Sequence, residues 1–271
     1  MIPLRDNIRS RTTPWINYTI IAVCCLVFYF QLQDQKSLLV ERYGMIPTRI
    51  VNPDQTVDVI DRVIVQTPFG DRIREISRPV APAGVIPWLT TLTCIFLHGG
   101  WMHIIGNMWM LWIFGDNVED RMGHRWYLLF YVFCGMVASA SHMLIDTGST
   151  VPTIGASGAI AGVMGAYMVL YPRAQVLSIV PIFFFIQMIV LPAPVFLGIW
   201  FLLQFFQGTF AVISIQSAGV AWWAHIGGFV TGFLIAWLFK QSGSTTPAVK
   251  VIDPRNQRST TYRIYVNDRR R

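Results

Sequence analysis

Charge is scarce in this chain. Only 13% of its 271 residues are Asp, Glu, Lys or Arg, against about a quarter in a typical soluble domain, and 54% are apolar. A chain with so little charge cannot bury that much apolar surface in one water-soluble core. The composition therefore excludes an ordinary soluble domain and predicts an integral membrane protein in contact with the lipid bilayer.

Cysteine is also sparse, and a signal-peptide pattern is missing. The four cysteines lie in or beside apolar segments, and the adjacent pair Cys24 and Cys25 would point to different helix faces, which argues against a disulfide framework. The first apolar run follows Arg5, Arg9 and Arg11, is as long as a membrane span and lacks a small-residue cleavage site. We therefore expect this run to stay as an anchor.

Six segments have the length and composition of membrane spans. The expected fold is an all-α polytopic membrane protein, a six-transmembrane-helix bundle with a long outer loop between the first two helices. The second and fifth spans are shorter than a full crossing. The six spans are residues 15–33, 101–115, 126–145, 154–171, 192–207 and 222–239. The chain then divides into an N-terminus (1–14), the first helix (15–33), an outer loop and insertion (34–100), a core of five helices (101–239) and a basic tail (240–271).

A further apolar run, from Val176 to Val190, raises a competing count of seven spans. Pro181 and Pro192 would interrupt a regular helix, and Ser178 and Gln187 add polar groups. These residues fit an interfacial or partly buried connection better than a seventh span.

Basic residues are distributed unevenly among the connections. Arg121, Arg125 and Arg173 lie in two of them, whereas residues 146–153 and 208–221 contain no basic residue. The positive-inside rule therefore predicts cytoplasmic termini and places the two connections without basic residues outside, with the long insertion on the same side. We expect the chain to lie in the cell (plasma) membrane with this orientation.

The C-terminal tail is basic and ends in Arg269, Arg270 and Arg271. Next to a membrane, such a tail suits anionic lipid headgroups. A nucleic-acid-binding tail is the alternative, but the excess charge lies beside a span rather than on a folded basic domain, so no nucleic-acid partner is expected.

A serine and a histidine lie near the outer ends of two predicted spans. Ser157 and His225 each lie about one turn beyond an outer connection, while His103 and Asn107 enter from the same side, four residues apart on one helix face. Four polar residues therefore share one depth in the outer half of the membrane. A hydroxyl beside an imidazole can act as a nucleophile with its general base.

Small residues can bring the two segments together. The segment with Ser157 has a face of Gly158, Ala161, Gly162, Gly165 and Ala166, and the segment with His225 repeats Ala224, Gly228 and Gly232 at a spacing of four. Two such faces can pack backbone against backbone. Glycines alone would equally suit a transporter or scaffold bundle, but a transporter would show an internal repeat and buried ion-pairing charges, and neither is visible.

Four ordered motifs resemble the rhomboid family of intramembrane serine proteases. They are His98-Gly-Gly-Trp-Met-His103-Ile-Ile-Gly-Asn107, Gly115-Asp-Asn-Val-Glu119-Asp-Arg121, Gly155-Ala-Ser157-Gly158 and Ala224-His225-Ile-Gly-Gly228-Phe-Val-Thr-Gly232. The resemblance covers roughly residues 88–239. It implies a serine-type endopeptidase that cleaves transmembrane segments near the outer membrane face, and its implied partners are single-span membrane proteins. An inactive rhomboid-like protein that binds membrane helices is the alternative.

The resemblance also implies the roles of the site residues. Ser157 would be the nucleophile and His225 the general base, in a dyad without an acid. His103, Asn107 and the backbone N–H of Ser157 would form the oxyanion site. His98, Gly155 and Gly158 would support it, although a surface histidine that caps the second span explains His98 equally well. Glu119 and Arg121 would fix the cytoplasmic end of the second span.

No cofactor is expected. A zinc site from His98, His103 and His225 would lack a carboxylate or cysteine to complete it and would leave the serine unexplained. Of the other histidines, His124 is expected to be solvated and His142 to be structural. The chain gives no indication of its oligomeric state.

Two positions depart from the family pattern. Trp88 is one position early for the usual Trp-Arg pair and no arginine follows it, and Ala161 replaces the aromatic ring that stacks on the histidine in many relatives. Another ring, such as Tyr167 or Trp222, could orient His225 instead. The fifth span is rich in bulky rings that suit either a lipid-facing helix or a lateral substrate gate: Phe196, Trp200, Phe201, Phe205 and Phe206.

Overall fold

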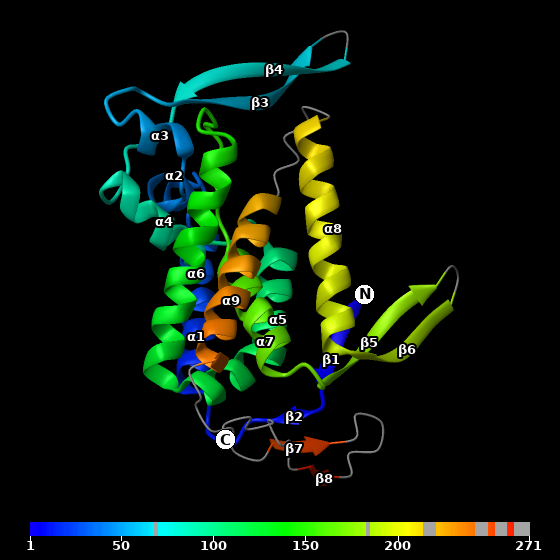
Figure 1. The fold of residues 1–271 in the computed structure, drawn as a ribbon. Coiled ribbons are helices and arrows are strands. Elements are labelled where there is room, and N and C mark those ends of the chain that lie inside the picture. The colour runs from blue at the N-terminus through cyan, green and yellow to red at the C-terminus, as the bar shows by residue number, and fades with distance from the viewer. Residues whose placement is uncertain (68–69, 183–184, 214–220, 242–248, 253–258, 263–271) are drawn as a thin grey trace.

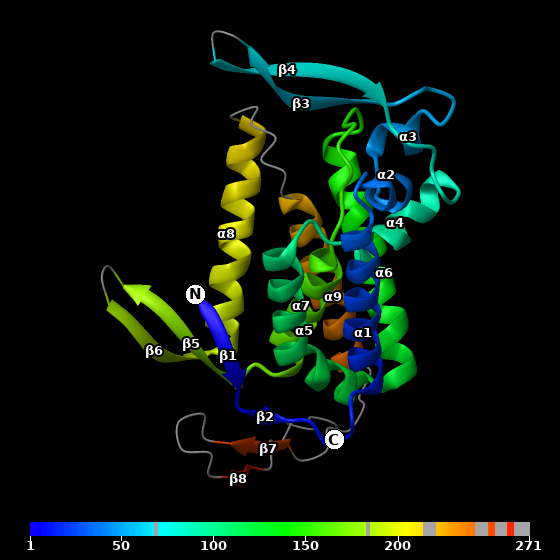
Figure 2. The ribbon, with the colours of Figure 1, turned by 180° about the vertical axis from the view of Figure 1, so that it is seen from behind.

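Six long helices form the body of the molecule, with short strands at its periphery (Figures 1 and 2). The computed structural model describes residues 1–67, 70–182, 185–213, 221–241, 249–252 and 259–262. The long helices are α1 (Trp15–Gln33), α5 (Trp101–Met122), α6 (His124–Ile145), α7 (Ser157–Leu170), α8 (Ala193–Ile213) and α9 (Trp222–Gln241). Each overlaps a predicted span, but α5 and α8 continue beyond the predicted ends at 115 and 207, so the expectation that the fifth span is shorter than a full crossing was wrong. Helix α7 is almost wholly buried and contacts α5, α6, α8 and α9.

Four of these helices are long and apolar enough to cross a membrane: α1, α6, α8 and α9. Helix α7 is apolar but has only 14 residues, and α5 ends in the charged run Asp116 to Arg121. The central short helix is therefore enclosed by longer ones. The four helices support a membrane bundle, and the expected count of six spans stays a prediction.

Glycines bring α7 and α9 into backbone contact, as the small-residue pattern predicted. A Cβ atom added to Gly228 would lie 2.0 Å from the Gly158 carbonyl oxygen, and one added to Gly232 would lie 1.9 Å from the Gly162 oxygen. No side chain fits at either distance. This close backbone contact places the N-terminal ends of α7 and α9 side by side. Ser157 and His225 therefore lie close together.

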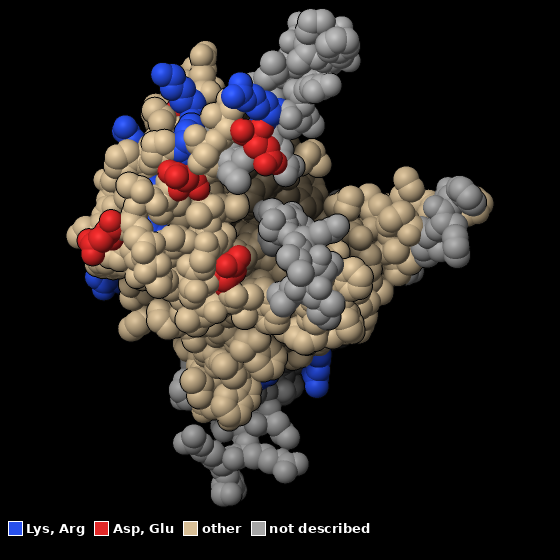
Figure 3. Space-filling view, turned by 90° about the horizontal axis from the view of Figure 1, so that it is seen from above, with Lys and Arg blue, Asp and Glu red and all other residues tan. Residues whose placement is uncertain are grey.

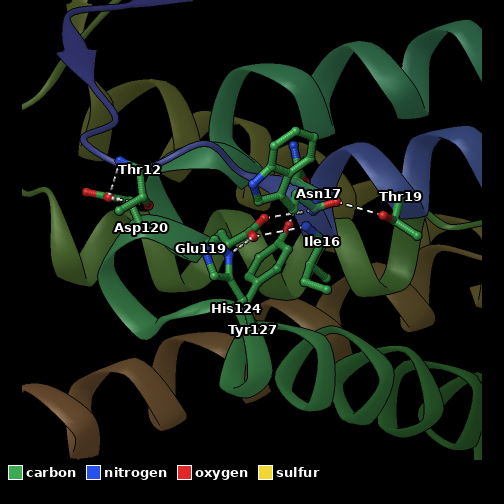
Figure 4. Close-up of polar contacts among 9 residues, drawn as sticks. Thr12, Ile16, Asn17, Thr19, Glu119, Asp120, His124 and Tyr127 are labelled. Carbon is green, nitrogen blue, oxygen red and sulfur yellow. Dashed lines mark hydrogen bonds and ion pairs between the residues drawn. The ribbon is translucent and has the colours of Figure 1, made fainter.

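The end of α5 holds the start of α1. The Glu119 carboxylate is fully buried and accepts hydrogen bonds from the backbone N–H groups of Ile16 (3.0 Å) and Asn17 (2.7 Å), which α1 cannot satisfy internally (Figure 4). A carboxylate at this position also complements the positive end of the helix dipole. His124 contacts the same carboxylate while its side chain stays 44% exposed, so the expectation that His124 is solvated holds, with an added contact to Glu119.

A three-stranded sheet replaces the expected connection before α8. Strand β1 (Ile2–Asp6) pairs antiparallel with β5 (Gln175–Ile182), which pairs with β6 (Phe185–Pro192). The run from 176 to 190 is thus not a seventh helix, and its described residues, 176–182 and 185–190, are strands of this connection. Its β-branched and aromatic residues favour a strand, and the prolines that exclude a helix are tolerated at strand ends and edges.

Other strands also lie outside the bundle. Strand β2 (Ile8–Arg9) pairs with β7 (Val249–Ile252), which pairs with β8 (Ser259–Tyr262), and the rest of the tail lies outside the described residues. The all-α expectation therefore holds for the bundle and not for the termini, the insertion or the connection before α8. Asp6, at the end of β1, accepts hydrogen bonds from Asn117 Nδ2 (2.9 Å) and the Tyr167 hydroxyl, and burial raises its pKa to about 8.

The insertion folds on the opposite end of the bundle, beside the 146–153 connection. It contains α2 (Leu38–Tyr43), α3 (Pro47–Val51) and the antiparallel hairpin of β3 (Asp58–Thr67) and β4 (Gly70–Pro79). Short turns η1 (Pro87–Leu89), α4 (Thr90–Thr93) and η2 (Cys94–Phe96) lead to α5. Charged residues of both signs gather on one side of this end (Figure 3).

A buried carboxylate fixes the hairpin to α2. Glu41 accepts hydrogen bonds from Arg78 Nη2 (2.6 Å) and the backbone N–H of Ala81 (2.8 Å), and Arg49 Nη1 donates to the Glu41 carbonyl (2.7 Å). The hydrogen bond from Arg78 lowers the pKa of Glu41. The insertion therefore has its own polar and apolar core.

Candidate active site

Ser157 is the first residue of α7, and the glycine before it shapes the turn into the helix. Gly155 has φ +128°, a conformation that L side chains rarely adopt, and its N–H donates to the Cys94 carbonyl (2.9 Å). A Cβ on Gly155 would lie 2.8 Å from Cε1 and Nε2 of His103 and 3.6 Å from Ser157 Oγ. The glycine thus lets the His103 ring and the serine hydroxyl approach the same point.

Ser157 and His225 are hydrogen-bonded. The distance from Ser157 Oγ to His225 Nε2 is 2.7 Å, and both side chains are half-buried. Ser157 and His225 are 68 positions apart in the sequence, and the close contact between α7 and α9 brings their side chains together. The pair has the geometry that a general base needs to take a hydroxyl proton.

Gln204 on α8 completes this arrangement, and the sequence interpretation did not find it. Its Oε1 lies 2.6 Å from His225 Nδ1, and the side chain is 8% exposed. An amide oxygen only accepts hydrogen bonds, so Nδ1 carries the ring proton and Nε2 is left to accept from Ser157. Residues 196, 204 and 208 are buried and residue 200 is half-buried, so these positions share one face of α8.

Two tryptophans surround the His225 ring. Trp222 lies edge-on to it, with ring centroids 6.2 Å apart, and Trp200 lies 5.9 Å away. Tyr167 instead contacts Phe114 and forms a hydrogen bond with Asp6 near β1. Rings from α8 and α9 therefore flank the His225 ring.

His103 and Asn107 lie on α5 beside the serine. The N–H of Gly99 donates to His103 Nδ1 (3.1 Å), so the neutral ring carries its proton on Nε2, the atom nearest Gly155. Asn107 is 8% exposed, and its Nδ2 has no hydrogen-bond partner among the described residues. A buried amide without a partner is costly in a folded protein. The His103 ring thus lies beside the turn into Ser157, and Asn107, one helical turn further along α5, has an amide donor without a partner among the described residues.

His98 is buried behind His103. It is 2% exposed, its ring meets the His103 ring edge-on at 5.3 Å, and Gln31 holds its backbone with two hydrogen bonds of 3.0 Å. Its interpretation as a surface histidine was therefore wrong, because the start of α5 is covered by α1. Burial lowers the pKa of His98 to about 4, so this ring is neutral at physiological pH.

Metal-binding groups do not gather at the site. The described part of the chain contains no cluster of three or more His, Cys, Asp or Glu side chains able to hold a metal ion. His142, near the end of α6, has a buried Nδ1 with no partner among the described residues, and all four cysteines are free thiols.

The fold and site define a helical membrane protein with a hydrogen-bonded serine and histidine between central helices. Residues 87–242 match the Rhomboid domain family. This match covers more than half of the chain, and the chain belongs to the rhomboid family. With four helices long and apolar enough to cross a bilayer, it is an integral membrane protein.

Curated relatives share parts of this chain. Rhomboid protease GluP of Bacillus subtilis is 33% identical over 151 residues, 55% of this chain and 25% of the relative. RHOMBOID-like protein 5 of Arabidopsis thaliana is 35% identical over 77 residues, 28% of this chain and 25% of the relative. Rhomboid-like protein 11, chloroplastic, of the same plant is 27% identical over 164 residues, 59% of this chain and 55% of the relative. The matches span between a quarter and about half of the length of these relatives.

Proposed function

We propose that this protein is an intramembrane serine endopeptidase that cleaves transmembrane segments of membrane proteins. The observation that carries the proposal is the 2.7 Å hydrogen bond between Ser157 Oγ and His225 Nε2, with the ring proton held on Nδ1. This is the tautomer in which a histidine can remove the serine proton. Membership of a family that includes a named protease supports the same activity.

In the proposed reaction, Ser157 Oγ attacks the scissile carbonyl while His225 Nε2 accepts its proton. The negative charge on the carbonyl oxygen is stabilised by His103 Nε2–H, Asn107 Nδ2–H and the backbone N–H of Ser157, which is free at the start of α7. The imidazolium then gives its proton to the departing amine, and an acyl-enzyme forms. Water, activated by the same histidine, hydrolyses the ester.

The proposed orientation places the site toward the outside of the cell membrane and both termini in the cytoplasm. Three basic residues support it: Arg121 and Arg125 flank the turn from α5 to α6 and Arg173 follows the C-terminal end of α7, whereas Ser157 is at the N-terminal end of α7. Glycosylation-acceptor or reporter fusions in the 146–153 connection and after Gln241 would test it. Both fusions reporting the same side of the membrane would contradict it.

The proposed substrates are single-span membrane proteins that enter sideways, past α8, and unwind at small or helix-breaking residues. The distribution of rings on α8 supports this path. Phe196 is buried against Phe114, Trp200 and Phe201 pack on α9, and Phe205 and Phe206 are exposed. The inner rings hold the helix in place while the outer rings face lipid.

Cleavage of a tagged single-span protein in liposomes, with fluorophosphonate labelling in parallel, tests the proposal. We expect Ser157→Ala to abolish cleavage and labelling and His225→Ala to abolish cleavage. Ser141→Ala is the matched control, since its hydroxyl donates a hydrogen bond to the Val137 carbonyl within its own helix, α6. Labelling and cleavage that persist in Ser157→Ala, or a wild type inert toward several substrates and probes, would favour the noncatalytic helix-binding protein.

A further inference from the structure

We propose that Gln204 is the positioning residue for His225 and that it makes this positioning depend on α8. The proposal rests on the proposed protease function. Its basis is the 2.6 Å contact between Gln204 Oε1 and His225 Nδ1 from a buried side chain. The position corresponds to the orienting group of a serine hydrolase triad, supplied here by an amide instead of a carboxylate.

An amide suits this site because it lies among apolar rings. Trp200 lies one turn before Gln204 on α8 and contacts the His225 ring, and Trp222 contacts the same ring from α9. A buried carboxylate with no cation beside it would carry a large desolvation cost. The glutamine oxygen selects the reactive tautomer without that cost, although it stabilises the imidazolium less than an anion would.

Helix α8 therefore contributes to the chemistry as well as to the wall of the bundle. It is held against α9 by the Phe201 and Phe229 rings, 4.8 Å apart, and by Trp200. Outward movement of α8 to admit a substrate would lengthen the hydrogen bond from Gln204 and release the ring of His225. His225 is then correctly oriented only after α8 has returned to its place against α9. A site with α8 displaced would therefore catalyse hydrolysis poorly.

The experiment compares Gln204→Leu, Gln204→Glu and Gln207→Leu with wild type. Gln207 is an exposed glutamine on the same helix, so its variant controls for loss of an amide from α8. We expect Gln204→Leu to lower kcat about 10- to 100-fold, within the range of general-base effects, with little change in KM. Gln204→Glu should recover much of the rate and move the acidic limb of the pH–rate profile to higher pH, because a carboxylate stabilises the imidazolium.

The outcomes separate this proposal from the proposed function. Fluorophosphonate labelling of Ser157 at the wild-type rate in Gln204→Leu would overturn the positioning role and leave the protease function intact. Gln204→Glu as inactive as Gln204→Leu, with an unmoved acidic limb, would also overturn it. A wild type with no Ser157-dependent labelling would overturn the protease function and the role of Gln204 together.

A different part of the molecule carries a second inference: the β5–β6 hairpin lies in the interfacial region of the bilayer beside the base of α8. Residues 174–192 contain no charged side chain. Phe185, Ile186 and Met188 are 71%, 76% and 71% exposed. Neighbouring residues on a strand point to opposite faces, so both faces of the hairpin present apolar groups without protein cover.

The position of the hairpin indicates that lipid contacts its exposed apolar side chains. Strand β6 ends at Pro192 and α8, one of the four helices able to cross a membrane, begins at Ala193. The hairpin therefore starts where a span meets the membrane boundary. Figures 1 and 2 show it projecting sideways along the lower part of α8, and it forms the arm at the right of Figure 3, which shows no blue or red residue.

The pairing of its strands determines how deeply the β5–β6 hairpin can lie in the bilayer. In the order β1-β5-β6, the outer edge of β6 has no neighbouring strand among the described residues. Unpaired backbone groups are not tolerated in hydrocarbon but can be hydrated among lipid headgroups. The hairpin therefore lies at the boundary, with apolar side chains toward the acyl chains, and ties the base of α8 to one leaflet.

Fluorophore depth measurements test the second inference in the full chain. A Cys25→Ser background, in which the remaining native cysteines are buried, receives Ile186→Cys or the control Ile76→Cys, an exposed isoleucine on β4 in the insertion. Both are labelled with an environment-sensitive dye and placed in phosphatidylcholine–phosphatidylglycerol vesicles. We expect spin-labelled lipid to quench the dye at 186 and not at 76. Quenching of both only by iodide, or self-quenching at 186 that indicates a second copy, would overturn the inference.

Discussion

Single side chains determine whether this site can stabilise an oxyanion. Asn107 Nδ2 is a buried donor without a partner among the described residues, and we predict that it is reserved for the scissile carbonyl. Asn107→Ala should lower kcat about 100-fold or more, because an oxyanion donor acts mainly in the transition state. Cleavage of a single-span substrate in liposomes measures this effect. Asn52→Ala, an exposed asparagine in the insertion, should leave the rate unchanged, and equal rates in both variants would contradict the assignment.

Asp6 is the residue for which we predict a pH dependence of stability. Burial raises its pKa to about 8 in the folded protein, against about 3.9 in an unfolded chain. Between these values the folded state retains a proton that the unfolded state has released, so this carboxyl lowers stability as pH rises from about 4 to about 8. We expect Asp6→Asn to have the higher Tm in detergent at pH 8.5 and to match wild type near pH 4. A wild type and variant with parallel Tm profiles would show that Asp6 titrates normally.

The expected proximity of Ser157 and His225 agrees with their 2.7 Å hydrogen bond, and their catalytic roles stay a prediction. Ser157 and His225 could be paired because hydroxyl and imidazole groups are rare near the outer ends of apolar segments. Gln204 could not be found, because an amide on an apolar helix has no distinctive spacing from a histidine 21 positions away. The sequence could not decide between the two interpretations of His98 or show the contact of His124 with Glu119, because burial by α1 and that contact depend on packing between distant segments.

At the scale of elements, the attachment of α8 determines substrate access. Phe205 contacts Trp223 of α9 at a ring distance of 6.4 Å and is 42% exposed. Phe205→Ala should ease outward movement of α8 and raise cleavage of a single-span substrate about 2- to 10-fold, corresponding to the ~0.5–1.5 kcal/mol of an aromatic pair. Phe206→Ala is the control, because its ring is 65% exposed and contacts Phe205 within the same helix. Unchanged cleavage in Phe205→Ala would count against gating by α8.

The helices were predictable from hydropathy, and the strands mostly were not. Long apolar runs with small-residue faces specify helices and their contacts without knowledge of the rest of the chain. The run from 176 to 190 has neither helical nor alternating periodicity, so its pairing with β1, more than 160 positions away, could not be read from it. Strand pairing of this kind depends on the bundle bringing both segments to one end.

At the scale of the whole molecule, the insertion is a separate unit on the bundle. Residues Val57 and Val80 are joined by a backbone hydrogen bond of 2.8 Å, so the β3–β4 hairpin leaves and returns at one point. Its ion pair with Glu41 involves Arg78, which is 40% exposed, and such a pair contributes at most about 1 kcal/mol. The second hydrogen-bond donor to Glu41, the Ala81 N–H, lies outside the hairpin and remains when the hairpin is removed.

Replacing residues 58–79 with a two-residue glycine linker should therefore leave the bundle intact. We expect Tm in detergent to fall by about 2–4 °C, the shift that 1 kcal/mol produces in a protein of this size, and the rate of Ser157 labelling to stay at the wild-type value. Glu41→Leu leaves both Arg78 and the Ala81 N–H without this acceptor. It should therefore lower Tm by more than the deletion does. If labelling is retained but cleavage of a membrane substrate is lost, the hairpin recognises substrate; if labelling is lost, the hairpin belongs to the core and the modular arrangement is wrong.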